Sequence, residues 1–121
     1  MLALVLASTD MVDVLVVGSG GREHAIACKL RDSPRVRQVF CAPGNGGTAA
    51  EANMTNVPVK DSDVEGLVKL ASEKKVALVF VGPEASLCAG LADACQKAGT
   101  MYSITTVHQE NYLRPGHIFS A

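Results

Sequence analysis

Short runs of aliphatic and β-branched residues, each closed by a glycine-containing turn and followed by a helical pattern, recur along this chain. The first is Val12–Val17, which precedes Gly18, and the strongest is Val76–Val81, which precedes Gly82. Short, largely apolar runs of this kind are typical of strands that are covered on both faces. Because such strands alternate with helical patterns, the sequence predicts an α/β fold, a Rossmann-like doubly wound parallel sheet with right-handed crossovers.

The other elements follow from the same periodicities. Ser62 and Glu65 form the S-x-x-E pattern of a capping box at a helix start, and Gly99 stands where a helix usually ends. Residues 42–48 are predicted to be a turn-rich loop. We expect strands at 12–17, 36–41 and 76–81, an extended piece at 56–59, helices at 22–30, 62–74 and 87–98, and a fifth strand within 101–104.

The length favours a single domain. The chain has 121 residues, of which 48% are hydrophobic, so one compact core can be buried. We divide it into an N-terminal extension at 1–11, a Rossmann-like domain at 12–104 and a C-terminal tail at 105–121 without recognisable pattern. The opening apolar stretch is too short to span a bilayer and lacks the basic residues of a signal peptide. His108 and His117 in the tail are interpreted as solvated, because short metal-ligand spacings are missing.

Charge and cysteine content exclude several kinds of partner. Eleven basic and 12 acidic residues give a net charge of −1, which offers no broad attraction for nucleic acid or for an anionic membrane. Any anion must therefore be bound by local geometry. The cysteines form no C-x-x-C pair and are interpreted as small apolar residues in a reducing compartment, so we predict a cytoplasmic protein without a metal site. They are Cys28, Cys41, Cys88 and Cys95.

Three glycine-containing loops follow predicted strands, at 18–22, 42–48 and 82–87. In open parallel sheets ligands bind beyond the carboxyl ends of the strands, so these loops are expected to converge. The first loop opens a helix, where free backbone N–H groups and the helix dipole favour a phosphate. Arg22 and His24 are candidates for charge-assisted donors to that phosphate. Glu23 is explained by its favourable interaction with the helix dipole rather than as a catalytic base.

A nucleotide-cofactor site is the alternative interpretation of the first loop. Dinucleotide-binding domains use G-x-G-x-x-G and an acidic residue at the end of the second strand. Here Glu23 replaces the third glycine, and the second strand ends in Phe40-Cys41-Ala42. The P-loop pattern G-x-x-x-x-G-K-[ST] is excluded, because no Gly-Lys pair lies near this turn. A dinucleotide- or nucleotide-cofactor-binding Rossmann module therefore remains open as the second hypothesis.

Three segments together resemble one family. VLVVGSGGREHAIACKL at 14–30, APGNGGTA at 42–49 and VGPEASL at 81–87, in this order and at this spacing, are similar to the N-terminal domain of glycinamide ribonucleotide synthetases. The resemblance covers about residues 12–99. It implies a Rossmann-like domain of the kind placed ahead of an ATP-grasp module, which helps to bind phosphoribosylamine. It also implies that the full-length enzyme joins this amine to glycine with ATP and Mg²⁺ (or Mn²⁺) in de novo purine (IMP) biosynthesis.

The resemblance implies substrate-binding roles but no catalytic residue, metal ligand or cofactor in this stretch. After Gly99 the chain departs from the family, which continues towards the ATP-grasp module. We therefore expect this polypeptide alone to lack phosphoribosylamine–glycine ligase activity and at most to bind a small phosphorylated sugar amine, with no nucleic acid or membrane partner. A fragment that folds poorly and binds nothing is a third possibility. The implied substrate-binding residues are Gly18, Gly20, Gly21, Arg22, Asn45, Gly46, Gly47, Thr48, Pro83 and Glu84.

Overall fold

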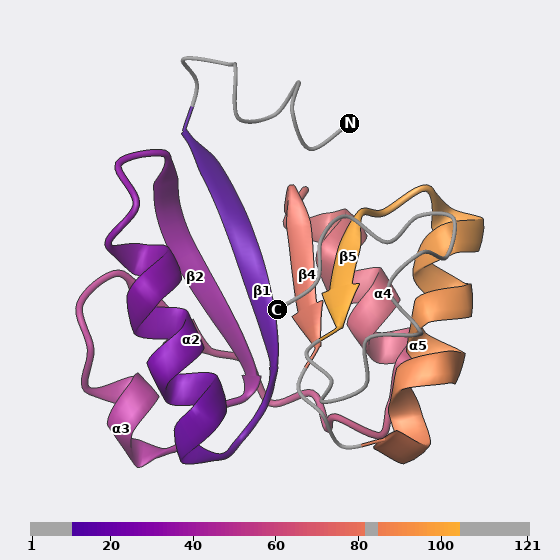
Figure 1. The fold of residues 1–121 in the computed structure, drawn as a ribbon, viewed down its shortest axis with the longest axis horizontal. Coiled ribbons are helices and arrows are strands. Elements are labelled where there is room, and N and C mark those ends of the chain that lie inside the picture. The colour runs from indigo at the N-terminus through magenta and orange to yellow at the C-terminus, as the bar shows by residue number, and fades with distance from the viewer. Residues whose placement is uncertain (1–10, 82–84, 105–121) are drawn as a thin grey trace.

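Helices and parallel strands alternate along the chain, as the sequence predicts (Figure 1). The computed structural model describes residues 11–81 and 85–104, for 85–89 and 102–104 without their side chains. The predictions for residues 1–10, for Pro83 and Glu84 and for the tail at 105–121 lie outside the described residues. The elements are β1 (Val12–Gly18), α2 (Gly21–Arg31), β2 (Val36–Pro43), α3 (Gly46–Ala49), β3 (Met54–Asn56), α4 (Val64–Glu73), β4 (Leu78–Val81), α5 (Ala85–Ala98) and β5 (Tyr102–Ile104).

The five strands form one parallel sheet in the order β3-β2-β1-β4-β5 (Figure 1). β1 lies at the centre, between β2 and β4. The chain moves outward from β1 to β3 and then crosses back to β4, so the strand order reverses between β1 and β4. In sheets of this type the ligand crevice lies beyond the carboxyl ends of the strands at that reversal.

Two apolar clusters cover the two faces of the sheet, which makes it doubly wound. On one face Leu15 of β1 and Val79 of β4 pack with Leu67 of α4 and with residues of α5. On the other face Val16 and Phe80 share a cluster with Ala27 of α2. Successive residues of β1 therefore enter opposite clusters, because strand side chains alternate between faces. Burial on both faces explains why β4 is apolar throughout and β1 is apolar at all but one position between Val12 and Val17.

One acidic residue interrupts the apolar run of β1. Asp13 is buried, and Arg37 of the neighbouring strand β2 donates to both of its carboxylate oxygens, at 3.0 and 2.6 Å. A buried carboxylate is costly unless it is paired and hydrogen-bonded. The bidentate contact with Arg37 therefore explains how the Asp13 carboxylate is accommodated within the central strand.

The predictions from the sequence were wrong for three local features. The predicted loop at 42–48 contains the short helix α3 and the last residues of β2. β3 lies at Met54–Asn56, earlier than the extended piece expected at 56–59. α4 is capped by Asp63, whose Oδ1 accepts from the Gly66 N–H at 3.0 Å, and not by the predicted box that begins at Ser62. Both Ser and Asp are good helix caps, so local pattern did not decide between neighbouring positions.

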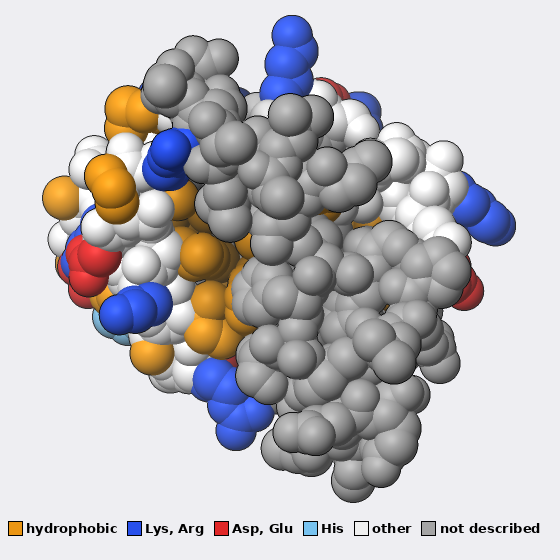
Figure 2. All heavy atoms as spheres, turned by 45° about the horizontal axis from the view of Figure 1, so that its top comes forward, with side chains coloured by type: hydrophobic (Ala, Val, Ile, Leu, Met, Phe, Trp, Pro, Cys, Tyr) orange, Lys and Arg blue, Asp and Glu red, His pale blue; other side chains and the backbone are white. Residues whose placement is uncertain are grey.

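Basic side chains are dispersed on the face shown in Figure 2, where Lys and Arg lie around the periphery rather than in one patch. This distribution agrees with the balanced charge of the sequence. Within residues 11–81 and 85–104, every helix is too short or too polar to cross a membrane.

Candidate functional site

The turn between β1 and α2 is an exposed corner at the carboxyl end of the central strand. Gly18 is buried and adopts a φ of +138°, whereas the residues from Ser19 to Arg22 are exposed. Gly20 is the N-cap residue of α2 and has no side chain with which to cap this helix start. A helix start without a side-chain acceptor leaves its first N–H groups available to water or to an anion. The backbone of this turn therefore has the features on which the prediction of a phosphate site rests.

The side chain of Glu23 occupies the space beneath this turn. The sequence analysis did not predict this position. The residue is only 4% exposed. A Cβ atom at Gly18 would collide with the Glu23 Cγ, and one at Gly20 would lie 3.2 Å from its Oε2. Two of the glycines in the motif thus make room for a buried acidic side chain. One sequence feature pointed to this burial. Glu23 replaces the third glycine of the dinucleotide-binding pattern, at a position where helix and strand pack closely.

Asn45 joins the second glycine-rich loop to the first. Its Nδ2 donates to the Ser19 carbonyl at 2.9 Å, while its Oδ1 accepts from the Thr48 N–H at 2.9 Å and so caps α3. The Gly44 N–H also donates to the Gly18 carbonyl, at 3.1 Å. The structure therefore brings together the loops that follow β1 and β2, which were expected to converge.

Thr48 supports the second loop from inside. Its side chain is buried, and its hydroxyl accepts from the Asn45 N–H at 2.8 Å and donates to the Asn56 Oδ1 at 2.7 Å. Asn56, on β3, returns a hydrogen bond from its Nδ2 to the Asn45 carbonyl at 2.8 Å. Asn56 was missed by the sequence analysis, because only the fold places it beneath this loop. The polar atoms of Thr48 are thus used to hold Asn45 and the start of α3.

Two glycines and one arginine face outward from this corner. Gly21 and Gly46 are exposed and are the first residues of α2 and α3, and a Cβ added at either would meet no atom within 4 Å. Arg22 is also exposed, and within the described residues its guanidinium forms no hydrogen bond or ion pair. Gly47 instead lies against His24, since a Cβ there would come within 2.6 Å of the His24 Cε1.

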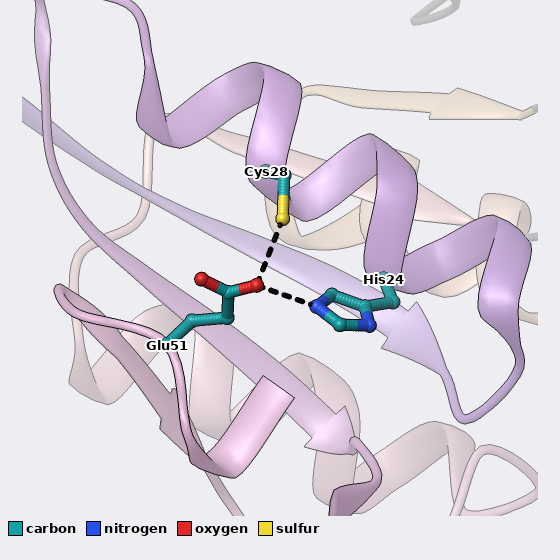
Figure 3. Close-up of side chains that lie close together, drawn as sticks. All are labelled: His24, Cys28 and Glu51. Carbon is teal, nitrogen blue, oxygen red and sulfur yellow. Dashed lines mark hydrogen bonds and ion pairs between the residues drawn. The ribbon is translucent and has the colours of Figure 1, made fainter. Parts of the chain in front are cut away.

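His24 faces Glu51 and belongs to a second cluster (Figure 3). Its Nε2 lies 2.9 Å from the Glu51 Oε2, to which Cys28 also donates at 3.5 Å. Arg31 donates to the other oxygen, Oε1, at 2.8 Å. His24, Cys28 and Arg31 are spaced four and three residues apart on α2 and share one helix face. The sequence could not locate Glu51, which lies 27 residues beyond His24.

The contacts of this cluster keep Glu51 ionised. Hydrogen bonds from His24, then from Arg31 and Cys28, lower the pKa of Glu51 from 4.5 to about 2. Burial, and next the neighbouring Glu51 carboxylate, raise the pKa of the Cys28 thiol. At neutral pH the cluster therefore contains a carboxylate and a protonated thiol.

A pH dependence of stability follows from the Glu51 contacts. Because its folded-state pKa is depressed, the stabilisation is present above pH 4.5 and is lost as pH falls from there towards about 2. We expect Glu51→Gln to flatten the acid side of a plot of melting temperature against pH. Glu65→Gln, in the exposed first turn of α4, is the control. Equal acid-side slopes for the parent chain and Glu51→Gln would contradict the depressed pKa.

The chain is similar to proteins of one family. The family model described as phosphoribosylglycinamide synthetase, N domain, matches residues 12–107. A phosphoribosylamine–glycine ligase of Allochromatium vinosum is 55% identical over 86 residues, which are 71% of this chain and 20% of that protein. One of Haemophilus influenzae is 48% identical over 88 residues, 73% of this chain and 20% of that protein. The chain thus spans about a fifth of the length of these relatives.

Among solved structures, a protein from Listeria monocytogenes described as a UDP-N-acetylglucosamine 2-epimerase has a similar fold. Its TM-score is 0.57 at 10% sequence identity, covering 87% of this chain and 32% of the other. At that identity the likeness concerns the fold alone, and it agrees with the predicted α/β class.

Proposed function

Because the chain belongs to the phosphoribosylglycinamide synthetase N-domain family, we propose that it forms the part of a phosphoribosylamine–glycine ligase that binds the phosphorylated sugar amine. The relatives are about five times as long as the matched stretch. In this proposal ATP, Mg²⁺ (or Mn²⁺) and the ATP-grasp module belong to the remainder of a longer protein of de novo purine biosynthesis. Cys28, Cys41 and Cys95 are free thiols, which supports a reducing, cytoplasmic compartment.

The observation that carries the proposal is the outward-facing corner at the starts of α2 and α3. The start of α2, whose N-cap residue is a glycine, offers backbone N–H groups, and Arg22 adds an exposed cation beside them. No described residue requires a glycine at Gly21 or Gly46, because a Cβ atom at either position would have open space around it. A ligand that approaches the backbone closely would require it. We therefore propose that the substrate phosphate lies at Gly21 and Arg22.

The remaining implied residues have supporting roles in this proposal. Gly18 and Gly20 allow Glu23 to fill the turn from below. Asn45 and Thr48 hold the second loop against the first, so that Gly46 and Gly47 lie beside the phosphate position. Pro83 and Glu84, which follow β4 in the sequence, are proposed to complete the site from the other side of the strand reversal. In this proposal these residues bind and orient the amine. Holding a reactant in the geometry of the reaction lowers the activation barrier.

The strand order favours the second hypothesis as well, since dinucleotide-binding sheets begin with the same order. Those domains hold a ribose with an acidic residue at the end of the second strand. β2 ends in Cys41-Ala42-Pro43, and Glu51, the acidic residue that follows, is held by His24 and Arg31. The described residues thus support a sugar phosphate better than a dinucleotide.

Titration of the 121-residue chain with ribose 5-phosphate, a stable analogue of the amine, and in parallel with NAD tests the proposal. Saturable binding of ribose 5-phosphate is expected in isothermal titration calorimetry. Arg22→Gln should weaken it about tenfold or more, since a hydrogen bond to a charged group contributes about 1.5–3 kcal/mol. Gly46→Leu should also reduce binding while leaving stability unchanged, because its side chain would enter open space.

Lys29→Gln is the matched charge control, because Lys29 is exposed in the last turn of α2 and far along the helix from the corner. It should bind ribose 5-phosphate as the parent chain does. Saturable NAD binding without a response to ribose 5-phosphate would support the second hypothesis instead. Binding of ribose 5-phosphate that is unchanged in Arg22→Gln would also refute the proposed phosphate position.

A further inference from the structure

Three side chains of the kinds that bind zinc meet beside α2, on the face of that helix that turns towards the segment after α3. His24 and Cys28 come from α2, and Glu51 follows α3 (Figure 3). One donor atom of each lies within 4.8 Å of the others. The spacing of four residues places His24 and Cys28 on one face of the helix. Helical zinc motifs use the same spacing to supply two ligands from one element.

The two separations that involve the Glu51 carboxylate are close to those between donor atoms around a zinc ion. Zinc binds imidazole, thiolate and carboxylate at about 2.0–2.3 Å in a tetrahedron, which sets its donor atoms about 3.3–3.6 Å apart. The Glu51 Oε2 lies 2.9 Å from the His24 Nε2 and 3.5 Å from the Cys28 Sγ. Both hydrogen bonds converge on one oxygen, so a cation that replaces the two protons needs only small side-chain shifts.

The surroundings of Glu51 support a ligand role. Arg31 holds the other carboxylate oxygen, Oε1, at 2.8 Å, which fixes the orientation of the carboxylate and leaves Oε2 for a metal. Ligating carboxylates are usually held by an outer partner in this way. The side chains of His24 and Glu51 are 29% and 31% exposed, so water can reach a fourth coordination position.

We propose that His24, Cys28 and Glu51 bind a single Zn²⁺ ion, with water as the fourth ligand. The mixed nitrogen, sulfur and oxygen donors suit zinc, whereas Mg²⁺ and Ca²⁺ prefer oxygen alone. On binding, a zinc–sulfur bond forms and the Cys28 proton passes to solvent, while zinc bonds to the His24 Nε2 and the imidazole carries its proton on Nδ1 instead of Nε2. The ion would connect α2 to the segment after α3, and Gly47 of α3 already lies against His24. The three ligands do not include Gly21 or Arg22, where the substrate phosphate is proposed to lie.

Titration of the metal-free 121-residue chain with Zn²⁺ alone, in competition with a chromophoric chelator, tests the inference. We expect one ion per chain and a higher melting temperature with Zn²⁺. Co²⁺ in place of Zn²⁺ should give the intense visible absorption of a tetrahedral site and a thiolate charge-transfer band. Cys28→Ser should abolish that band and weaken Zn²⁺ binding about a hundredfold or more, since losing even an outer partner costs about 10–100-fold.

Proton release provides a further readout. Binding should release about one proton per ion, so the affinity should rise about tenfold per pH unit while Cys28 is protonated. The charged groups that face this thiol are Glu51, Arg31 and Asp32. Glu51→Gln should weaken binding without abolishing the thiolate band, which distinguishes the loss of one ligand from misfolding.

Cys95→Ala is the matched control, because it removes a thiol buried in the cluster on the opposite face of the sheet. It should bind Zn²⁺ as the parent chain does. Failure of the parent chain to bind one Zn²⁺ ion would overturn the inference and leave a hydrogen-bonded cluster only. The same conclusion follows if Cys28→Ser and Glu51→Gln bind Zn²⁺ as tightly as the parent.

Discussion

Gly18→Ala is expected to lower the free energy of unfolding by about 3 kcal/mol, because two costs add at this position. Gly18 has a φ of +138°, a backbone conformation that residues with a side chain rarely adopt. The new Cβ would also collide with the buried Glu23 side chain, which has little room to move. Urea unfolding followed by far-ultraviolet circular dichroism measures the change.

Gly21→Ala is the matched control within the same turn. Nothing lies within 4 Å of a Cβ at Gly21, which is the first residue of α2. The free energy of unfolding should stay equal or rise by up to about 1 kcal/mol, since alanine is favoured over glycine in helices. If Gly18→Ala were as stable as Gly21→Ala, Glu23 could not occupy the space beneath the turn.

Leu15→Ala is expected to lower the free energy of unfolding by about 3–5 kcal/mol, as large-to-small changes in a well-packed core do. Leu15 is completely buried, and β1 has strands on both sides, with Phe40 and Val79 as the neighbours of Leu15. A rigid sheet can close little of the cavity left by the lost side chain. Because domains are stable by only about 5–15 kcal/mol, the variant should unfold at a much lower urea concentration.

Met11→Ala tests whether that loss depends on burial. Met11 directly precedes β1 and is 54% exposed. Its replacement should change the free energy of unfolding by no more than about 0.5 kcal/mol. A small effect at Leu15 together with a large one at Met11 would contradict the central position of β1.

The sequence predicted the fold well because buried parallel strands carry a strong and simple signal. The apolar runs of β1 and β4 identified two strands that are covered on both faces, and Gly99, with a φ of +74°, ends α5 as expected. Short elements carry weaker signals. α3 depends on the cap that Asn45 provides, and glycine-rich sequence such as Gly46-Gly47 gives no helical periodicity by which to recognise it.

The sequence was sufficient to predict that the loops of the candidate site lie together, but not which side chains pack beneath those loops. The crevice rule correctly brought together the loops that contain Ser19 and Asn45, since it needs only the strand order. The burial of Glu23 and the contacts of Glu51 depend on how distant segments pack. A local sequence pattern holds no information on such long-range neighbours. The interpretation of Cys28 as a small apolar residue therefore did not include its contact with Glu51.

The central position of β1 has a consequence for how this chain acquires its structure. β1 can pair with β2 soon after both are made, but its other edge waits until Leu78 reaches Val14. Pairing over such a long loop has a larger entropic cost and slows folding. Until β4 arrives, the hydrogen-bonding groups on that side of β1 stay open to strands of other molecules. During synthesis, the same strand that organises the finished sheet is therefore its most vulnerable point for aggregation.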